Sequence, residues 1–465
     1  MKKVFLFICL AAGLMSCTKD ILDNEENNQK EEGLPMTFNV TVLETKAAKN
    51  AWEEGDEILV FFNGLATKYL YLKYSGEGWT STSEGGMLKD SDFTGLDSKT
   101  LTAVHFPEHV SVDYADGQFS FTSDGEPVYG YYLYETGKTY SVDGSTVTAT
   151  LSLGKPDGMV LFHVPDANGY TFSCPKIKPV ACASVGTDGG ITENVLQAGA
   201  RVGGVLDTDG VIFAGRLTTT ESAAWKFILA NNEQICTLTR TRSLTAGSMY
   251  NFPAPTVTGG TNWTVQNASD LVVDLGITVN GKKIKWAKYN LGADTETGFG
   301  DYLAWGELTG YNEGKRYFSW SNYYFNPSGD GTTFTKYTGS DYSTLEKEDD
   351  AAYAALGGYF RMPTYEEISA LINLTYDQVE NYNGSGVNGG KFTGSNGNTI
   401  FLPFASFRRD DGSVGSSSIG IYATSSLNST IKDAKVLEVG SDGYWTKEPR
   451  KIGISVRPVY VEPEM

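Results

Sequence analysis

Residues 52–62 read WEEGDEILVFF, and this stretch indicates the kind of fold that the first half of the chain adopts. Residues 58–62 form an uninterrupted apolar run, which is typical of a strand that is buried on both faces. Gly55 and Asp56, directly before the run, predict a tight turn into the strand, and Trp52 is expected to pack back over the sheet. The segment therefore predicts a buried strand of a β-sheet.

Similar strand signals recur further along the chain. Residues 160–164 (VLFHV) are another continuous apolar run, and residues 146–153 (TVTATLSL) alternate between polar and apolar side chains. Asp-Gly dipeptides, which favour hairpin turns, separate several of these segments. A cluster of chain-breaking residues at 153–158 (LGKPDG) divides the series. We therefore expect two β-sandwich lobes, at residues 36–153 and 154–256.

The composition excludes several classes of function. The 465 residues contain 37 Lys and Arg against 56 Asp and Glu, which gives a net charge of −19. Nucleic acid is not expected as a partner, because neutralising its phosphates needs a basic surface. The chain has only three His and five Cys, which leaves few residues for catalysis by either side chain. We expect an extracytoplasmic, β-rich protein that is not an enzyme and needs no cofactor.

The N-terminus has the organisation of a bacterial export signal. Two lysines precede an apolar stretch that is too short to span a membrane. Residues 14–17 (LMSC) resemble the lipobox of bacterial lipoproteins, which implies cleavage before Cys17 and lipid attachment to its thiol. Residues 17–35 form an acidic tether that resembles the surface-export signal of Bacteroidetes lipoproteins. We expect a signal peptide at residues 1–16 and a lipid-anchored protein exposed on the outer membrane.

The remaining cysteines do not suggest a disulfide framework. Cys174, Cys182 and Cys236 are odd in number, and their spacing does not fit a zinc site. The sequence is compatible with two alternatives. Either Cys174 and Cys182 form a disulfide bond, or all three cysteines are buried free thiols.

Two short motifs in the first half point to a family. The stretch WEEGDEI at 52–58 resembles the W-x-x-G-D-x-I signature of fimbrillin-like proteins from Bacteroidetes, and LTAGSMYNF at 244–252 resembles the strand that closes their domain. The resemblance implies two transthyretin-like β-sandwich lobes and a role in a pilus. Members that polymerise are trimmed at an Arg near the N-terminus, but the corresponding residues 45–47 read TKA in this chain. That difference favours an accessory, anchoring or tip-like role over a shaft subunit.

Three literal motif matches do not carry chemistry. Residues 105–109 (HFPEH) match a zinc-site pattern, but Pro107 would cost the required helix about 3 kcal/mol. We expect a strand edge on which both His105 and His109 are exposed instead. The GxGxxG match at residues 384–389 lacks the flanking strand and helix of a dinucleotide site. A calcium-loop pattern that begins at Asp90 has Leu101 where the bidentate Glu belongs. We therefore predict no metal site.

A linker-like stretch at residues 257–262 precedes a region of different composition, residues 263–465. Two capping boxes predict helices in this region, one beginning with STLE at 343–346 and running to residue 356, the other beginning with TYEE at 364–367. Strands are expected at residues 399–402, 434–439 and 453–459. The layout predicts an α+β domain.

Six sequence blocks in this region resemble the Fibrobacter succinogenes major paralogous domain family. They are NLG at 290–292, DYLAWGE at 301–307, DDAA at 349–352, RMPT at 361–364, NGNTIFLP at 396–403 and ISVRPV at 454–459. The resemblance implies a C-type-lectin-like fold related to the formylglycine-generating enzyme. One difference is Ala423, where the family carries Trp. The region has no Cys, so the catalytic thiols of that enzyme are absent, and it lacks the calcium–sugar motifs of animal lectins.

The segment YFSWSNYYF at 317–325 offers the strongest candidates for ligand binding. Aromatic faces stack on the C–H faces of sugars, and nearby polar groups bond their hydroxyls. The candidates are Tyr317, Trp320, Tyr323 and Tyr324. The alternative is that many of these rings pack into the core of their own domain.

Three hypotheses follow. The first is a lipid-anchored, accessory or tip-like fimbrial component whose lectin-like domain binds a glycan or a protein. The second is a free-standing glycan-binding surface lipoprotein that joins no pilus. The third is an enzyme that uses an unrecognised carboxylate pair in the C-terminal domain.

Overall fold

The computed structural model describes residues 33–43, 51–207, 209–256, 262–341 and 343–463. The expected signal peptide, the lipidation site Cys17, the TKA segment and most of the expected linker lie outside these ranges. The chain forms two compact units. The first contains the described residues up to Val128 together with Tyr132–Pro156 and Cys182–Glu193, and the second contains Tyr129–Tyr131, Asp157–Ala181 and the described residues from Asn194 onward. No helix among the described residues is both long enough and apolar enough to cross a membrane.

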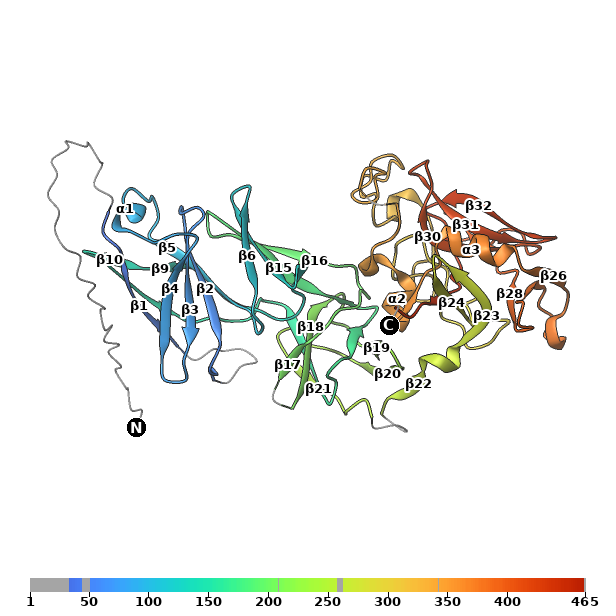
Figure 1. Ribbon diagram of the computed structural model, residues 1–465, viewed down its shortest axis with the longest axis horizontal. Coiled ribbons are helices and arrows are strands. Elements are labelled where there is room, and N and C mark those ends of the chain that lie inside the picture. Colours follow the sequence, from blue (N-terminus) through green and yellow to red (C-terminus); the bar gives the residue numbers. More distant parts are fainter. Residues whose placement is uncertain (1–32, 44–50, 208, 257–261, 342, 464–465) are drawn as a thin grey trace. The chain divides into compact units, whose positions relative to one another are not determined.

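The first unit is built almost entirely of strands. Its elements are β1 (Thr37–Val42), β2 (Glu57–Phe62), β3 (Tyr69–Tyr74), β4 (Trp79–Glu84), α1 (Asp90–Phe93), β5 (Thr100–His105), β6 (Ser111–Ala115), β7 (Gln118–Ser123), β8 (Glu126–Pro127), β9 (Leu133–Thr139), β10 (Ser141–Asp143) and β11 (Thr146–Leu151). The chain enters and leaves this unit within β15 (Val180–Gly186) and β16 (Ile191–Val195). The strands form three sheets, ordered β4-β3-β2-β5-β9, β1-β11-β10 and β16-β15-β7-β6, with β8 added to β7. Figure 1 shows β2, β3 and β4 side by side.

Strand β2 is buried on both faces, as its sequence predicts. Phe61 packs against Phe119 of β7 with ring centroids 4.6 Å apart, and Phe62 packs against Phe38 of β1 at 5.9 Å. The turn before β2 is tight because Gly55 adopts a positive φ of 98°. The expected buried strand is therefore confirmed.

The expectation that both histidines of the HFPEH segment are exposed is wrong for one of them. His105 is the last residue of β5 and is buried, with its Nδ1 2.7 Å from the backbone oxygen of Glu57 and Trp52 packed against its ring. His109 is exposed, and its Nδ1 lies 2.7 Å from the Glu57 carboxylate. Strand β5 pairs with both β2 and β9, and His105 lies opposite Leu133 of β9, a placement that the local sequence does not reveal.

The second unit begins with two facing sheets, ordered β14-β18-β12-β21, with β17 on β18, and β13-β19-β20-β22. Their strands are β12 (Met159–Pro165), β13 (Thr171–Ser173), β14 (Ile177–Lys178), β17 (Val205–Asp207), β18 (Gly210–Leu217), β19 (Ala223–Ala230), β20 (Gln234–Arg242), β21 (Met249–Asn251) and β22 (Thr264–Asn267). The core between them contains Phe162, Phe213, Trp225 and Trp263. Because Trp263 and β22 belong to this sandwich, the chain just beyond residue 262 is tied to it.

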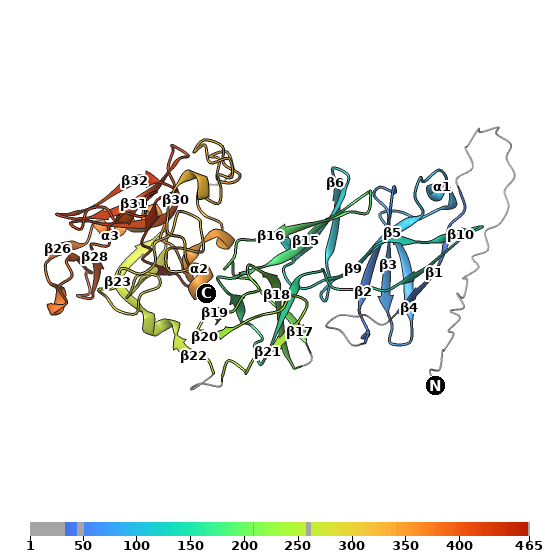
Figure 2. The same cartoon turned by 180° about the vertical axis from the view of Figure 1, so that it is seen from behind.

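The rest of the second unit combines small sheets with short helices. Its strands are β23 (Val272–Val279), β24 (Lys282–Ala287), β25 (Phe360–Arg361), β26 (Thr375–Val379), β27 (Gly389–Thr393), β28 (Thr399–Pro403), β29 (Phe407–Arg408), β30 (Gly420–Leu427), β31 (Asp433–Val439), β32 (Gly443–Pro449), β33 (Gly453–Ile454) and β34 (Val459–Tyr460). Its helices are η1 (Ala268–Leu271), η2 (Trp320–Asn322), η3 (Lys347–Asp349), α2 (Ala351–Leu356), α3 (Tyr365–Ile372) and η4 (Tyr382–Gly384). The sheets are β23-β24-β34-β25, β26-β27-β28, β29-β33 and β30-β31-β32. Figure 2 shows α3 beside β31 and β32.

One predicted helix is correct and the other begins later than expected. Thr364 and Glu367 form the expected capping box at the start of α3. Helix α2 instead begins after Asp350, whose carboxylate accepts a 2.9 Å hydrogen bond from the Tyr353 backbone N–H. Thr344 forms a bridge with Ser426 of β30, so this part of the chain is extended and cannot start the helix.

The expected strand at 453–459 is divided into β33 and β34. Between them, the backbone of Val456 accepts a hydrogen bond from Leu291, and Ser455 bridges to Tyr422. The chain therefore changes partners in the middle of the segment.

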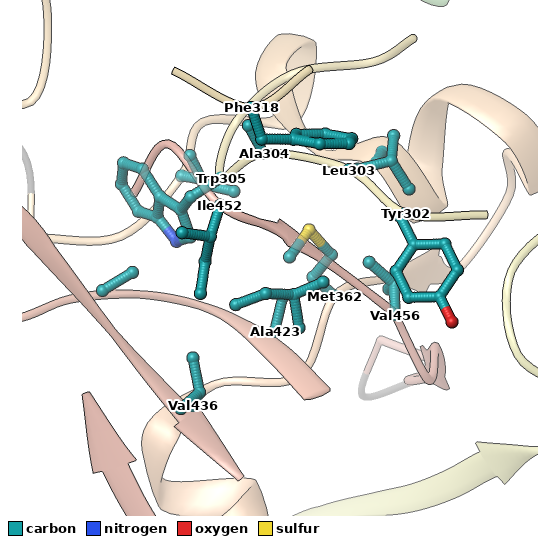
Figure 3. Close-up of a cluster of buried hydrophobic side chains, with 14 of the residues drawn as sticks. Tyr302, Leu303, Ala304, Trp305, Phe318, Met362, Ala423, Val436, Ile452 and Val456 are labelled. Atoms are coloured by element: carbon teal, nitrogen blue, oxygen red, sulfur yellow. The ribbon is translucent and has the colours of Figure 1, made fainter. Parts of the chain in front are cut away.

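The core of the C-terminal part accommodates the unusual Ala423. Figure 3 shows Ala423 beside Met362 and Val456 in a buried cluster that also contains Trp305. The indole Nε1 of Trp305 donates a 2.8 Å hydrogen bond to the backbone oxygen of Thr424, the residue after Ala423.

The predicted fold class, a multidomain and mostly β chain with a few helices in its C-terminal part, is confirmed. The boundaries of the three expected domains remain a prediction. Three cysteines in the described part of the chain are buried free thiols, namely Cys174, Cys182 and Cys236. Cys174 and Cys182 therefore do not form the disulfide bond that the sequence left open.

Candidate functional site

A buried arginine supports the loops that carry the predicted aromatic segment. Arg450 is 1% exposed, and its Nε donates a 3.0 Å hydrogen bond to the hydroxyl of Tyr323. Its remaining nitrogens donate to the backbone oxygens of Tyr337, Ile431 and Lys336. Its guanidinium carbon also lies 4.4 Å from the centre of the Phe334 ring. The loops are therefore anchored to a common polar centre inside the fold.

A buried ion pair fixes the two ends of the aromatic segment. Glu307 forms an ion pair with Lys315, and its carboxylate also accepts a 2.8 Å hydrogen bond from the Tyr324 backbone N–H. Burial raises the pKa of Glu307, and the contact with Lys315 opposes that rise. Within the segment, Ser319 and Asn322 form a capping box around η2. These contacts hold the backbone of residues 317–324 in place beneath their exposed side chains.

The structure divides the four predicted ligand-binding residues. Tyr317 and Tyr324 are 57% and 48% exposed. Trp320 is half-buried, with its ring 5.7 Å from that of Phe334. Tyr323 is 2% exposed and donates a hydrogen bond to the Trp305 backbone oxygen, so its expected place on the surface is wrong. Tyr323 has an extended backbone, and successive residues of an extended chain point in opposite directions, so Tyr323 and Tyr324 differ in exposure.

Three residues from the six sequence blocks, Trp305, Arg361 and Arg457, make contacts within the fold. Arg457 donates hydrogen bonds to the Asn290 side chain and to backbone oxygens including that of Phe401, and burial lowers its pKa to about 10. Arg361 forms a two-pronged contact with Glu367, with nitrogen–oxygen distances of 2.8 and 2.5 Å. Trp305 lies in the same buried cluster as Ala423.

Sequence reasoning missed a group of basic and aromatic side chains beside Tyr317. Arg316 lies over the ring of Tyr311 at 4.3 Å, and Arg408, 92 positions further along the chain, lies over the same ring at 3.6 Å. Their pairing depends on a loop–loop contact between distant segments, so no spacing in the sequence marks it. The shared aromatic content of the region was the only available signal.

A second exposed aromatic group was also missed. Tyr444 and Trp445 on the edge strand β32 are each 43% exposed. Trp445 packs edge-on against Tyr365, the first residue of α3, at 5.1 Å.

Two acidic clusters among the described residues have the composition of cation sites. Glu346, Glu348 and Asp349 surround the ammonium group of Lys336, which lies 2.5–2.8 Å from an oxygen of each. The lysine thus supplies the positive charge itself. His163, Asp207 and Asp209 form the other cluster, with the Nε2 of His163 3.0 Å from an Asp209 oxygen.

Asp301 and Glu313 form a carboxyl pair at a 470 Å³ cavity that also contains Asp294. Burial, followed by the hydrogen bond and the charge of Glu313, raises the pKa of Asp301 to about 8. The Oδ1 of Asp301 accepts backbone hydrogen bonds from Tyr302 and Asn312 at 2.8 and 2.9 Å. The carboxyl group therefore holds the loop together, and one of its oxygens is already occupied.

Comparison with protein families found no matching family. No curated protein matches the sequence. Among solved structures, the chain is similar to a fimbrial protein from Bacteroides ovatus, with 11% identity and a TM-score of 0.24 over 92% of this chain and 99% of that one. It is also similar to the fimbrial anchor protein Mfa2 from Porphyromonas gingivalis, with 11% identity and a TM-score of 0.21 over 42% of this chain and 78% of that one.

Proposed function

We propose that the chain is a non-enzymatic, lipid-anchored protein of the bacterial cell surface, an accessory or tip-like fimbrial component. In this proposal the β-sandwiches position a C-terminal lectin-like domain that binds a glycan or a protein. The observation that carries the proposal is the exposure of Tyr317 and Tyr324 on a segment whose backbone is anchored by Glu307 and Arg450. Rigid exposed aromatic rings are suited to stacking on sugars and to protein contacts.

The fimbrial part of the proposal rests on the resemblance of residues 52–58 and 244–252 to fimbrillin-like proteins. The lipid anchor rests on the lipobox resemblance that ends at Cys17. Pull-down of the surface-exposed protein from the native cell tests both. Recovery with pilus subunits and retention in the lipoprotein fraction are expected. Recovery without any pilus subunit would favour a free-standing glycan-binding lipoprotein.

A glycan array probed with the full chain tests the binding function. The full chain is needed because Arg201, Ser173 and Gln197 of the preceding sandwich bond directly to the C-terminal part. We expect binding to at least one class of glycan, and we expect the Y317A variant to lose it. An array without binding, repeated with and without calcium, would contradict the glycan proposal.

An enzymatic alternative has one structural feature in its favour, the Asp301–Glu313 pair at its cavity. The two backbone bonds to Asp301 favour a role in loop structure instead. Hydrolysis of any glycan bound on the array, abolished by the D301N variant, would support the enzymatic alternative.

A further inference from the structure

Two arginines share one tyrosine ring at the edge of the predicted binding surface. The guanidinium carbons of Arg316 and Arg408 lie 4.3 and 3.6 Å from the ring centre of Tyr311, and Arg408 also lies 4.8 Å from the ring of Tyr302. Arg316 is exposed and is the immediate neighbour of Tyr317. The two guanidinium carbons therefore lie no more than about 7.9 Å apart, and the ring they share is attractive to both cations.

The loops that carry the two arginines are fixed to each other. The backbone N–H of Phe318 donates a 3.3 Å hydrogen bond to the backbone oxygen of Arg409. A Cβ atom on Gly412 would lie 3.1 Å from the backbone oxygen of Arg316, so the two chains pass at close range. The arrangement of the two arginines is therefore set by the backbone rather than by flexible side chains alone.

Neither arginine has a carboxylate partner among the residues that the structure describes. Arg316 donates no hydrogen bond to a described residue, and Arg408 donates only one, at 3.3 Å to the backbone oxygen of Gly412. The Nε of Arg408 is buried without a hydrogen-bond partner. Neighbouring lysines differ, since Lys315 is paired with Glu307 and Lys451 with Asp410.

This pattern is unusual for a chain with a net charge of −19, in which acidic partners are plentiful. Two unpaired guanidinium groups on one ring repel each other and leave most of their donors unused. An oxyanion beside them would relieve the repulsion and accept charge-assisted hydrogen bonds, often two from a single guanidinium group. The adjoining ring of Tyr317 offers a face on which a sugar can stack.

We infer that Arg316 and Arg408 form the recognition site for the acid group of an acidic glycan, while Tyr317 stacks on its sugar ring. The inference rests on the proposed glycan-binding function and adds the chemical class of the ligand. A planar carboxylate and a tetrahedral sulfate group can each offer two oxygens to one guanidinium group. The ligand is therefore a carboxylated or sulfated polysaccharide.

The test measures binding of the full chain to three immobilised polysaccharides: polygalacturonate as the carboxylated probe, dextran sulfate as the sulfated probe and dextran as the neutral probe. We expect binding to one or both acidic probes, weakened by salt because the contact is partly exposed. The R316Q variant should weaken that binding by about tenfold or more, the loss expected for a charge-assisted hydrogen bond.

The matched control is R242Q. Arg242 is also an exposed arginine over a tyrosine ring, at 4.6 Å from the centre of Tyr250, but it lies in the preceding sandwich. It should leave binding unchanged. R408Q should weaken binding as R316Q does. Because Arg408 is half-buried, a melting curve of R408Q shows whether that variant still folds. Binding of the neutral probe at equal strength, or unchanged binding in R316Q, would overturn the inference while leaving glycan binding intact. Absence of binding to all three probes and to the glycan array would instead contradict the proposed glycan binding on which the inference rests.

Discussion

The Nε of Arg201 donates a 3.1 Å hydrogen bond to the backbone oxygen of Ala354, which lies 153 residues further along the chain. Arg201 is 4% exposed and also donates to the backbone oxygens of Tyr353 and Thr171. Ala354 belongs to the last turn of α2, and its carbonyl oxygen accepts hydrogen bonds from Arg201 and from the Ser173 hydroxyl. This contact joins the sandwich that precedes residue 256 to the C-terminal part of the same unit.

Replacing Arg201 should therefore destabilise the chain. The R201M variant removes the buried guanidinium and its hydrogen bonds to the backbone oxygens of Thr171, Tyr353 and Ala354, and a hydrogen bond to a charged group contributes about 1.5–3 kcal/mol. We expect a total loss of at least about 2 kcal/mol in the free energy of unfolding, measured by urea denaturation of the second unit's transition. R242Q, which removes an exposed arginine, should change stability by less than about 0.5 kcal/mol. Equal stability of R201M and wild type would show that the contact contributes nothing.

Asp301 predicts a pH dependence of stability. Its pKa is raised to about 8 in the folded chain from a usual value of 3.8, first by burial and then by Glu313. Its contribution to stability is therefore fully present below about pH 4 and is lost as pH rises through about 8. The D301N variant keeps an oxygen for the two backbone bonds and should lose this decline. Melting temperatures between about pH 4 and 9 measure it, with exposed Asp97→Asn as the control.

Lys336 should be essential for the acidic loop around it. Burial lowers its pKa, but hydrogen bonds with Asp349, Glu346 and Glu348 outweigh that effect and raise it. The K336M variant leaves three carboxylates facing one another, and we expect a loss of about 3 kcal/mol or more. Because the ammonium group supplies the cation, the wild-type melting temperature should not change with EDTA or added calcium. A large calcium shift that persists in the D209N variant, which alters the other acidic cluster, would contradict this expectation.

Alanine substitutions of the tyrosines in the aromatic segment should have different effects on ligand binding and on stability. Y317A and Y324A remove exposed rings and should weaken ligand binding with little change in stability. Y323A removes a buried ring and its hydrogen bonds to Trp305 and Arg450, so it should cost about 3–5 kcal/mol. Binding assays beside urea denaturation separate the two outcomes. A Y323A variant as stable as wild type would show that the core assignment is wrong.

Local sequence patterns predicted the elements that depend on local physics. The buried run at 58–62 is β2, the alternation at 146–153 contains β11, and the capping box at Thr364 begins α3. In each case, the side chains within one or two turns decide the conformation. The predicted start of α2 was wrong because a partner in β30 holds Thr344 in an extended conformation.

The candidate site was predictable only in part. The aromatic composition of 317–325 indicated a candidate binding segment, and Tyr317 and Tyr324 are exposed there. The burial of Tyr323 depends on Arg450, and the ring of Tyr311 receives Arg408 from a loop far along the chain. Such contacts join segments that are far apart in the sequence, so no periodic pattern of residues predicts them.

The sequence by itself determined where strands form, where turns occur and that the surface is acidic, because these follow from side-chain periodicity, turn residues and charge counts. Only the tertiary structure decided which charged groups are neutralised by neighbours. It surrounds Lys336 with three carboxylates, yet leaves Arg316 and Arg408 on one ring without a described acidic partner. Electrostatic pairing depends on distances between atoms, and those distances exist only once segments remote in the chain are packed together.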